Sequence, residues 1–295
     1  MSLAARIGRR ESLPTRRTHF PRKPLVTLAS SETRCSITAH AVVVANLKRI
    51  AELRDVPGPP LGPQLPKRFL RHCDEHTIVG MSAVLTAISH LPAPLPDFHS
   101  WGVLAAPCLA GRLLSSRTLT LLPKTGAAGV SPHLIPQCSL HAMASAVSVG
   151  LGMHGPNMGV GGGPQSITEG LLAALSILDD PGVPGIWLLL TQWNEEPIPD
   201  GLGGATNDAV CCGVALALVA SAATATESLN TPTLSLRLPT QATPPRSAGL
   251  SFPIKLALPI KLAHFAAQLD AISLHRPNTS RWLHDCDWGA QLEVA

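Results

Sequence analysis

Three side chains near the middle of the sequence could act as nucleophiles or activate one. Cys138 precedes His141 by three residues, and Ser166 follows a run of glycines. A thiol or hydroxyl becomes a strong nucleophile when a base such as histidine lies within hydrogen-bonding reach. One hypothesis is therefore a small acyltransferase or hydrolase that uses Ser166, Cys138 or His141. The alternative is that Cys138 and His141 only pack against neighbouring elements.

Other clusters of titratable residues are weaker indications of a catalytic or metal site. Residues 195–200 contain three carboxylates, which could form an acid–base group but are more typical of a solvated loop. Two short sets combine histidine with cysteine: His72, Cys73 and His76, and His284 with Cys286. Neither set offers four ligands at the spacing of a zinc site, so no metal is predicted.

A buried helix must carry the region around His141. Residues 139–149 are small or apolar on every side, which is typical of a helix enclosed in a core. Gly150, Gly152 and Gly155 then end the helix. Their G-x-G-x-x-G spacing fits a dinucleotide-binding motif, but that motif needs a strand before it and a helix after it. No cofactor is predicted.

A strand, a glycine turn and a second helix follow, and Ser166 lies where the turn meets the helix. Residues 157–160 form the predicted strand. Residues 161–163 are three glycines, a turn that other residues cross only with strain. The helix covers residues 166–178, where apolar side chains recur at helical spacing.

This order of elements resembles the nucleophile region of the β-ketoacyl synthases, the condensing enzymes of the thiolase-like superfamily. Upstream, the Pro-Lys-Arg sequence at residues 66–68, with Asp74 and an apolar helix after it, is similar to the family's basic-then-aspartate segment. The similarity is closest to the divergent synthase-like N-terminal domains of aryl-polyene and related polyketide systems, some of which act like chain-length factors. The central motifs that match are Ser131-Pro132, Ile135-Pro136, Leu151-Gly152 and Gly155-Pro156.

The nucleophilic cysteine of this family has no counterpart in the sequence. Counted from the Gly-Pro pair at residues 155–156, its position is occupied by Pro164, which is flanked by Gly163, Gln165 and Ser166. Proline has no nucleophile and no backbone N–H, so the acyl-enzyme and one oxyanion-hole donor are both lost. The family's two catalytic histidines lie in a C-terminal half that this chain does not complete. We therefore expect no condensing activity from the chain by itself.

The resemblance instead implies a partner role. We expect an accessory or chain-length-factor-like protein that pairs with an active ketosynthase in fatty acid or polyketide assembly, with acyl carrier protein as a further candidate partner. In the family, the strand that enters the nucleophile turn pairs with its copy across a two-fold axis. Here that strand is Asn157, Met158, Gly159 and Val160, so a heterodimer or homodimer is expected. A degenerate paralogue with a purely structural role is the remaining interpretation.

The amino-acid composition indicates a globular protein with a core and argues against a membrane-spanning one. The chain of 295 residues is 45% hydrophobic and only 14% charged, which suits a sizeable core. Its longest apolar runs are shorter than the roughly 20 residues that a membrane-spanning helix needs, so no membrane span is predicted. Seven cysteines without a C-x-x-C pair favour a reducing compartment, and the expected location is the cytoplasm.

The N-terminal segment differs in charge from the rest of the chain. Residues 1–34 carry eight basic and two acidic residues, a net charge of +6, against +4 for the whole sequence. The segment has almost no aromatic side chains for base stacking, so no nucleic-acid partner is predicted. It is interpreted as a disordered extension, with a transit peptide as the alternative. The other predicted units are a ketosynthase N-terminal-like domain at residues 35–238, then a linker, amphipathic helix and C-terminal tail at 239–295.

The predicted fold class is α/β, a thiolase-like layered sandwich that is essentially the N-terminal ketosynthase half. Unbroken apolar runs at residues 186–191 and 210–219 are typical of strands covered on both faces, as in a parallel sheet. We therefore expect a mostly parallel central sheet with helices on its faces. Residues 234–238 alternate apolar and polar side chains, which predicts an edge strand. Residues 260–274 have the pattern of an amphipathic helix.

Overall fold

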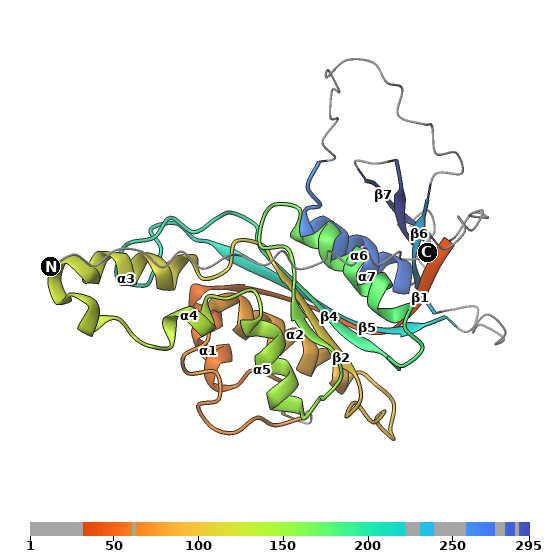
Figure 1. The fold of residues 1–295 in the computed structure, drawn as a ribbon, viewed down its shortest axis with the longest axis horizontal. Helices are drawn as coiled ribbons and strands as arrows, with labels where there is room; N and C mark the ends of the chain where they lie inside the picture. Colours follow the sequence, from red (N-terminus) through yellow and green to blue (C-terminus); the bar gives the residue numbers. More distant parts are fainter. Residues whose placement is uncertain (1–31, 61–62, 222–230, 239–257, 275–280, 287–288) are drawn as a thin grey trace, which may run out of the picture.

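In the part of the chain that the structure describes, a single mixed sheet of eight strands forms the centre of the protein (Figure 1). The computed structural model describes residues 32–60, 63–221, 231–238, 258–274, 281–286 and 289–295. The strand order is β3-β2-β4-β5-β1-β6-β8-β7. The strands are β1 (Glu32–Asn46), β2 (Gly102–Pro107), β3 (Asn157–Gly159), β4 (Ile186–Trp193), β5 (Val210–Ala220), β6 (Thr233–Arg237), β7 (Trp282–Asp285) and β8 (Gln291–Val294).

The expectation of a mostly parallel sheet is wrong. Among the described strands, β2 pairs in parallel with β3 and β4, and the other five pairings are antiparallel. An unbroken apolar run shows only that a strand is covered on both faces, whatever the direction of its neighbour. The connection from β4 to β5 at residues 194–209 contains no helix, so β5 returns antiparallel to β4.

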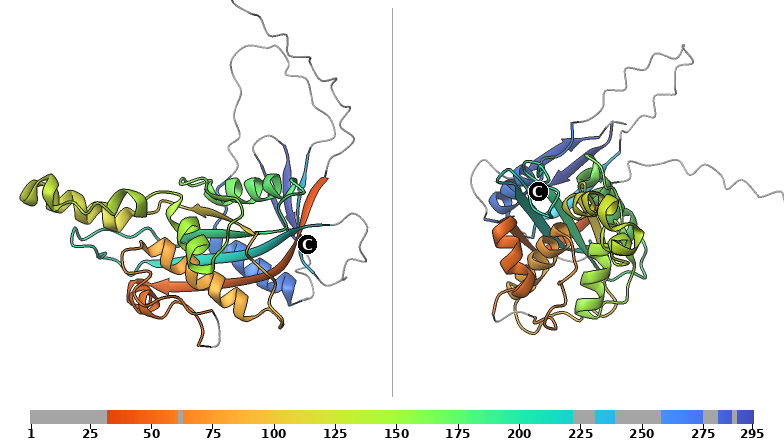
Figure 2. Two further views of the ribbon diagram at one scale, coloured as in Figure 1. Left: turned by 60° about the horizontal axis from the view of Figure 1, so that its bottom comes forward. Right: turned by 90° about the vertical axis from the view of Figure 1, so that its left-hand side faces the viewer.

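Helices cover both faces of the sheet (Figures 1 and 2). One face packs against α1 (Leu47–Asp55), α2 (Glu75–Ser89) and α5 (Ala142–Leu151), and the other against α6 (Ser166–Leu178) and α7 (Leu262–Ser273). Alternate residues of each strand therefore enter different cores. Trp187 of β4 packs on the α2 side, and its neighbour Leu188 packs on the α6 side. In the described part of the chain, no helix has the length and apolar character needed to cross a membrane.

The long strand β1 joins two parts of the sheet. Its residues 35–46 pair with β5, its first five residues pair with β6, and a register shift in the pairing with β5 lies between Ile37 and Ala39. Strand β6 is thus an internal strand between β1 and β8, not the predicted edge strand. The predicted C-terminal tail contributes β7 and β8 to the same sheet. Residues 1–31 and nearly all of the predicted linker lie outside the described residues, and the division into domains stays a prediction.

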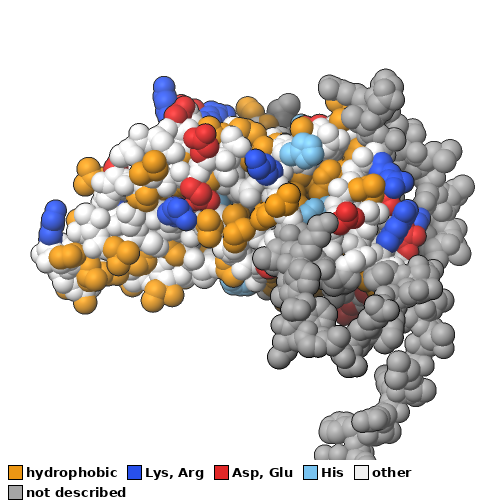
Figure 3. All heavy atoms as spheres, turned by 90° about the horizontal axis from the view of Figure 1, so that it is seen from above, with side chains coloured by type: hydrophobic (Ala, Val, Ile, Leu, Met, Phe, Trp, Pro, Cys, Tyr) orange, Lys and Arg blue, Asp and Glu red, His pale blue; other side chains and the backbone are white. Residues whose placement is uncertain are grey.

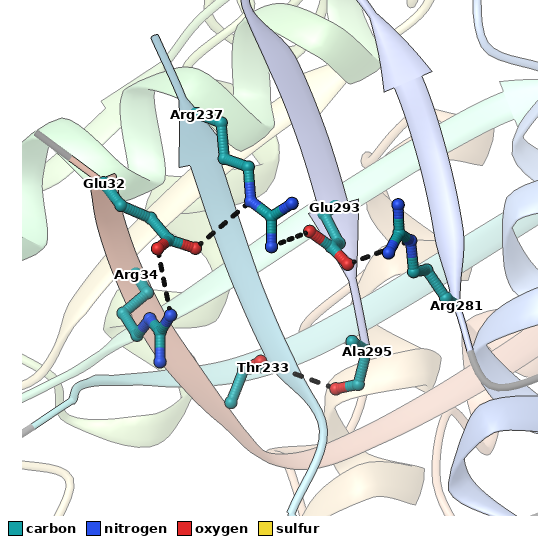
Figure 4. Close-up of polar contacts among 7 residues, drawn as sticks. All are labelled: Glu32, Arg34, Thr233, Arg237, Arg281, Glu293 and Ala295. Carbon is teal, nitrogen blue, oxygen red and sulfur yellow. Dashed lines mark hydrogen bonds and ion pairs between the residues drawn. The ribbon is translucent and has the colours of Figure 1, made fainter. Parts of the chain in front are cut away.

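A ladder of ion pairs crosses these C-terminal strands (Figure 4). The buried carboxylate of Glu293 lies 2.8 Å from the Arg237 guanidinium and 3.1 Å from that of Arg281. Arg237 also contacts Glu32 at 3.4 Å, and Glu32 contacts Arg34 at 3.1 Å. Opposite charges on neighbouring strands stabilise their register, and a buried carboxylate needs such partners to offset its desolvation. The ladder therefore links β1, β6 and β8 to the segment that begins β7.

An arm projects from the end of the sheet beyond β2 (Figures 1 and 2). It consists of α3 (Arg112–Thr125), the short helix η1 (Ala127–Gly129) and α4 (Leu134–Gln137). Leu113 is the buried residue of α3, whereas Leu119 and Ile135 are 67% and 82% exposed. The arm therefore gains little from its own burial, and its position depends on how its first residues are held.

The Asp74 carboxylate holds the start of the arm against α2. It is the N-cap of α2, and its Oδ1 accepts a hydrogen bond from the Thr77 amide at 2.9 Å. Its Oδ2 accepts from the Gly111 amide at 3.1 Å, where the chain turns into α3. Gly111 has a φ of 72°, and a Cβ there would collide with Cys138, so only glycine fits. One buried carboxylate thus satisfies the first amides of two helices.

Glu75, the next residue, carries a carboxyl whose pKa is strongly perturbed. Burial raises the pKa of Glu75 to about 7, and the negative charge of Asp74 adds to the rise. Between the ordinary value of 4.5 and about 7, the folded protein therefore binds a proton that the unfolded chain releases. The contribution of Glu75 to stability is largest near pH 4.5 and decreases as the pH rises to about 7.

Replacing this carboxyl by a neutral amide should remove that pH dependence. We expect Glu75→Gln to match the wild type near pH 4.5 and to exceed its free energy of unfolding by about 1–2 kcal/mol at pH 8. That range is reduced from the full shift because Glu75 is partly exposed. Urea unfolding at both pH values measures the difference. The exposed Glu195→Gln is the matched control, and an equal effect of the two variants at pH 8 would contradict the assignment.

Candidate functional site

The glycine turn before α6 is attached to the end of β2. Gly161 and Gly162 have φ values of 78° and 94°, which glycine adopts without strain. Gly162 forms a parallel bridge with Cys108, and its carbonyl accepts from the Leu109 amide at 3.3 Å. A Cβ on Gly162 would collide with Leu140. The turn is therefore a fixed part of the sheet end, as the predicted strand–glycine–helix order requires.

Pro164 lies in this turn, two residues before α6 begins. It is exposed, and the carbonyl of Gly163 accepts from the Ser166 amide at 3.1 Å across it. Gln165 is the N-cap of α6 but makes no side-chain capping hydrogen bond. The strand that leads into the turn, β3, is at the edge of the sheet. Pro164, just before the N-terminus of α6, therefore offers neither a nucleophile nor a backbone amide donor.

Ser166 is fully buried at the first position of α6, and sequence reasoning did not foresee its surroundings. Its neighbour is the thiol of Cys108, which also lies 3.9 Å from the Gln192 amide nitrogen. Burial raises the pKa of Cys108, and the Gln192 amide and the Ser166 hydroxyl offset part of the rise. Among the described residues, Ser166 Oγ has no partner in hydrogen-bonding geometry. A buried thiol and hydroxyl that, among the described residues, have no base hydrogen-bonded to them are unsuited to nucleophilic catalysis.

The predicted pair of Cys138 and His141 is not assembled. The Cys138 thiol contacts the Ser115 hydroxyl at 3.8 Å and the Gly111 carbonyl at 3.9 Å. Burial raises its pKa, which disfavours the reactive thiolate. His141 is exposed at the N-cap of α5, and no hydrogen bond joins it to Cys138 in the described part of the structure. The packing interpretation suits Cys138 better.

The acidic residues after β4 have structural roles. The Asp200 carboxylate accepts from the Leu202 amide at 2.6 Å and from the Gly204 amide at 2.9 Å, which lowers its pKa. Glu196 lies 3.4 Å from the Arg112 guanidinium at the start of the arm. Burial raises the pKa of Glu196, and Arg112 offsets part of that rise. These groups hold a turn and a contact to the arm.

The histidine and cysteine residues of the two sets contact different parts of the structure and do not form a common site. His76 is buried, and its Nδ1 lies 2.8 Å from the Thr191 hydroxyl, whereas His72 stacks on His133 of the arm. His284 lies 3.4 Å from the Thr168 hydroxyl in the first turn of α6. Within the described ranges, no group of three or more His, Cys, Asp or Glu residues could hold a metal ion.

The strand predicted to form an interface is accessible. β3 pairs with β2 on one side, and its other side is an edge of the sheet that the described strands form. Met158 is 43% exposed, and Val160 is attached to β2 by a 2.9 Å bond from its amide to the Ala105 carbonyl. The side-chain oxygen of Asn157 is buried, with no partner among the described residues. The interface itself stays a prediction.

Comparison with known proteins connects this fold to ketosynthases. No family model matches the sequence, and no curated protein matches it. The solved structure of a ketosynthase (ApeO) in complex with its chain length factor (ApeC) from Xenorhabdus doucetiae matches with a TM-score of 0.52 and 13% identity. The match covers 88% of this chain and 98% of that one. The two chains therefore share a fold.

Two further solved structures belong to the same class of protein. The ishigamide ketosynthase/chain length factor matches at 17% identity with a TM-score of 0.46, over 69% of this chain and 65% of that chain. The complex AntDE:AntF, a type II polyketide carrier protein with its ketosynthase, matches at 14% identity with a TM-score of 0.45. That match covers 64% of each chain. The structural neighbours are thus ketosynthase and chain-length-factor proteins, and this chain spans about two thirds of the length of these two.

The environment of Ser166 can be tested by removing its hydroxyl. Since the buried oxygen has no well-placed partner, we expect Ser166→Ala to leave the free energy of unfolding unchanged or to raise it by up to about 1 kcal/mol. Ser148→Ala is the matched control, because Ser148 Oγ donates to the Met153 carbonyl at 2.7 Å, and its loss should cost about 1 kcal/mol. Urea unfolding measures both. Esterase activity that disappears in Ser166→Ala would instead support the hydrolase hypothesis.

Proposed function

We propose that this chain is a non-condensing, chain-length-factor-like partner of an active ketosynthase, working in polyketide assembly of the aryl-polyene type. The observation that carries the proposal is Pro164, which stands at the mouth of α6 where the resemblance places the nucleophilic cysteine. The shared fold with the ApeO–ApeC structure supports it, since that structure pairs a ketosynthase with its chain length factor. Acyl carrier protein is a further proposed partner.

The chemistry around α6 also favours a partner role over catalysis. Ser166 is buried without a base, and Cys138 is engaged with Gly111 and Ser115. We expect the isolated chain to show no turnover of acyl-carrier or malonyl-carrier substrates. Condensation or hydrolysis by the purified chain alone would contradict this part of the proposal. All seven cysteines are free thiols, which supports a reducing compartment, and the proposed location is the cytoplasm.

The proposed interface is centred on β3 and involves Asn157, Met158, Gly159 and Val160. An exposed strand edge offers unpaired amides and carbonyls to a partner strand. In a two-fold arrangement, the β3 strands of two chains would pair and join two sheets into one. An interface of this permanent kind buries roughly 2,000 Å² or more, which extends well beyond β3.

Introducing a charge at the centre of β3 should prevent this association. We expect Met158→Asp to abolish pairing with a candidate ketosynthase from the same organism, since an unpaired buried charge costs several kcal/mol. Light scattering of the chain, alone and co-expressed with that ketosynthase, measures the complex. Leu274→Asp at the end of α7 is the control, because Leu274 is 63% exposed and lies on a different element. A well-folded monomer in both preparations, insensitive to Met158→Asp, would contradict the interface.

A further inference from the structure

A cavity of about 820 Å³ lies at the start of α7, next to the end of β4 and to β7. Gln192 and Asn194 line it from β4 and the loop after it, Lys261 and His264 from α7, and Trp282 and His284 from β7. These segments are up to about 90 residues apart in sequence, and the sheet brings them together. The volume is within the range of small-molecule sites, which is about 300–1,000 Å³.

The charged side chains in the lining are basic. Lys261 is the N-cap of α7, and His264 and Arg281 face the same cavity. Among the described residues that line it, there is no aspartate or glutamate. Arg281 is partly neutralised by Glu293 at 3.1 Å, so Lys261 is the main source of positive charge. The positive end of the α7 dipole adds to that charge.

The rest of the lining combines aromatic and neutral polar side chains that other contacts hold in place. Trp282 is only 7% exposed, packs edge-on against Phe265, and stacks on His284 with an interplanar angle of 7°. His284 is placed in turn by the Thr168 hydroxyl of α6 at 3.4 Å. Gln192 Oε1 accepts from the first amide of α7 at 2.7 Å, which fixes the opposite wall. Seen from above, histidine and basic side chains lie beside hydrophobic ones on this face of the protein (Figure 3).

We infer that this cavity binds an aliphatic carboxylate of medium chain length. The carboxylate would pair with the Lys261 ammonium near the start of α7, and the alkyl chain would lie along the Trp282 indole. A cation in a cavity whose described lining has no acidic residue favours an anionic ligand. Burial of the alkyl chain against the aromatic side chain stabilises the complex. The inference is independent of the partner role proposed above, because it depends on α7 and β7 and not on β3.

Octanoate and its neutral counterpart octanamide test the two parts of this site. Isothermal titration of the full chain should show saturable binding of octanoate with one site per chain. We expect octanamide to bind about tenfold more weakly, and octanoate binding to weaken as salt is raised. Lys261→Gln should weaken octanoate binding about tenfold and leave octanamide binding unchanged. Trp282→Leu should weaken the binding of both ligands.

Lys48→Gln on α1 is the matched control, since it removes one exposed lysine far from the cavity. It should bind octanoate as the wild type does. Lys261 is exposed, so its replacement should leave folding intact, and the salt dependence of the wild type provides a measurement without any substitution. The inference is overturned if octanoate shows no saturable binding, if octanamide binds equally well, or if Lys261→Gln and Lys48→Gln have the same effect. Pairing with a ketosynthase is measured separately, so its failure would leave this result unaffected.

Discussion

The buried carboxylate of Asp74 is the interaction on which the arrangement of the site depends. It accepts amide hydrogen bonds from the first turn of α2 and from the turn that begins the arm. Without it, two helix starts would lose a partner for their amides inside the core, where such a loss is costly. Its charge has a second consequence, because it raises the pKa values of Glu75 and Cys73 beside it, where burial makes the larger contribution. The same group thus fixes the geometry of the arm and leaves its surroundings sensitive to pH.

The second constraint is the long strand β1, which brings the C-terminal segments onto the α6 face. Its residues 32–36 pair with β6 and its residues 35–46 pair with β5, so Cys35 and Ser36 lie between both neighbouring strands. The ion pairs around Glu293 then hold β6, β8 and the start of β7 in register. Because β7 lies over α6 and α7, His284 reaches Thr168 and a cavity remains between the elements. The site beside α7 is therefore a product of how these strands pair.

Local patterns in the sequence predicted the individual elements better than their arrangement. The glycines at 161–163 and the apolar run of α6 are signals within a few residues, and both elements lie where they were expected. Strand direction was predicted wrongly, since burial on both faces gives the same apolar run in either direction. The contacts of Gln192 with α7 and of Thr168 with His284 join residues 70 and 116 positions apart. No periodicity carries such information, because these contacts depend on topology alone.

The shape of the turn at Pro164 is set by packing that does not depend on the residue at position 164. Gly162 is bridged to Cys108, and a Cβ on Gly159 would collide with the Leu140 backbone, so the turn and β3 are constrained by packing against β2 and the start of α5. These constraints act whether or not a nucleophile follows. A proline at 164 is compatible with them, since the bond that closes the turn uses the Ser166 amide and not that of residue 164. Proline at position 164 therefore leaves the shape of β3 intact, and in the proposed role that shape is what the partner binds.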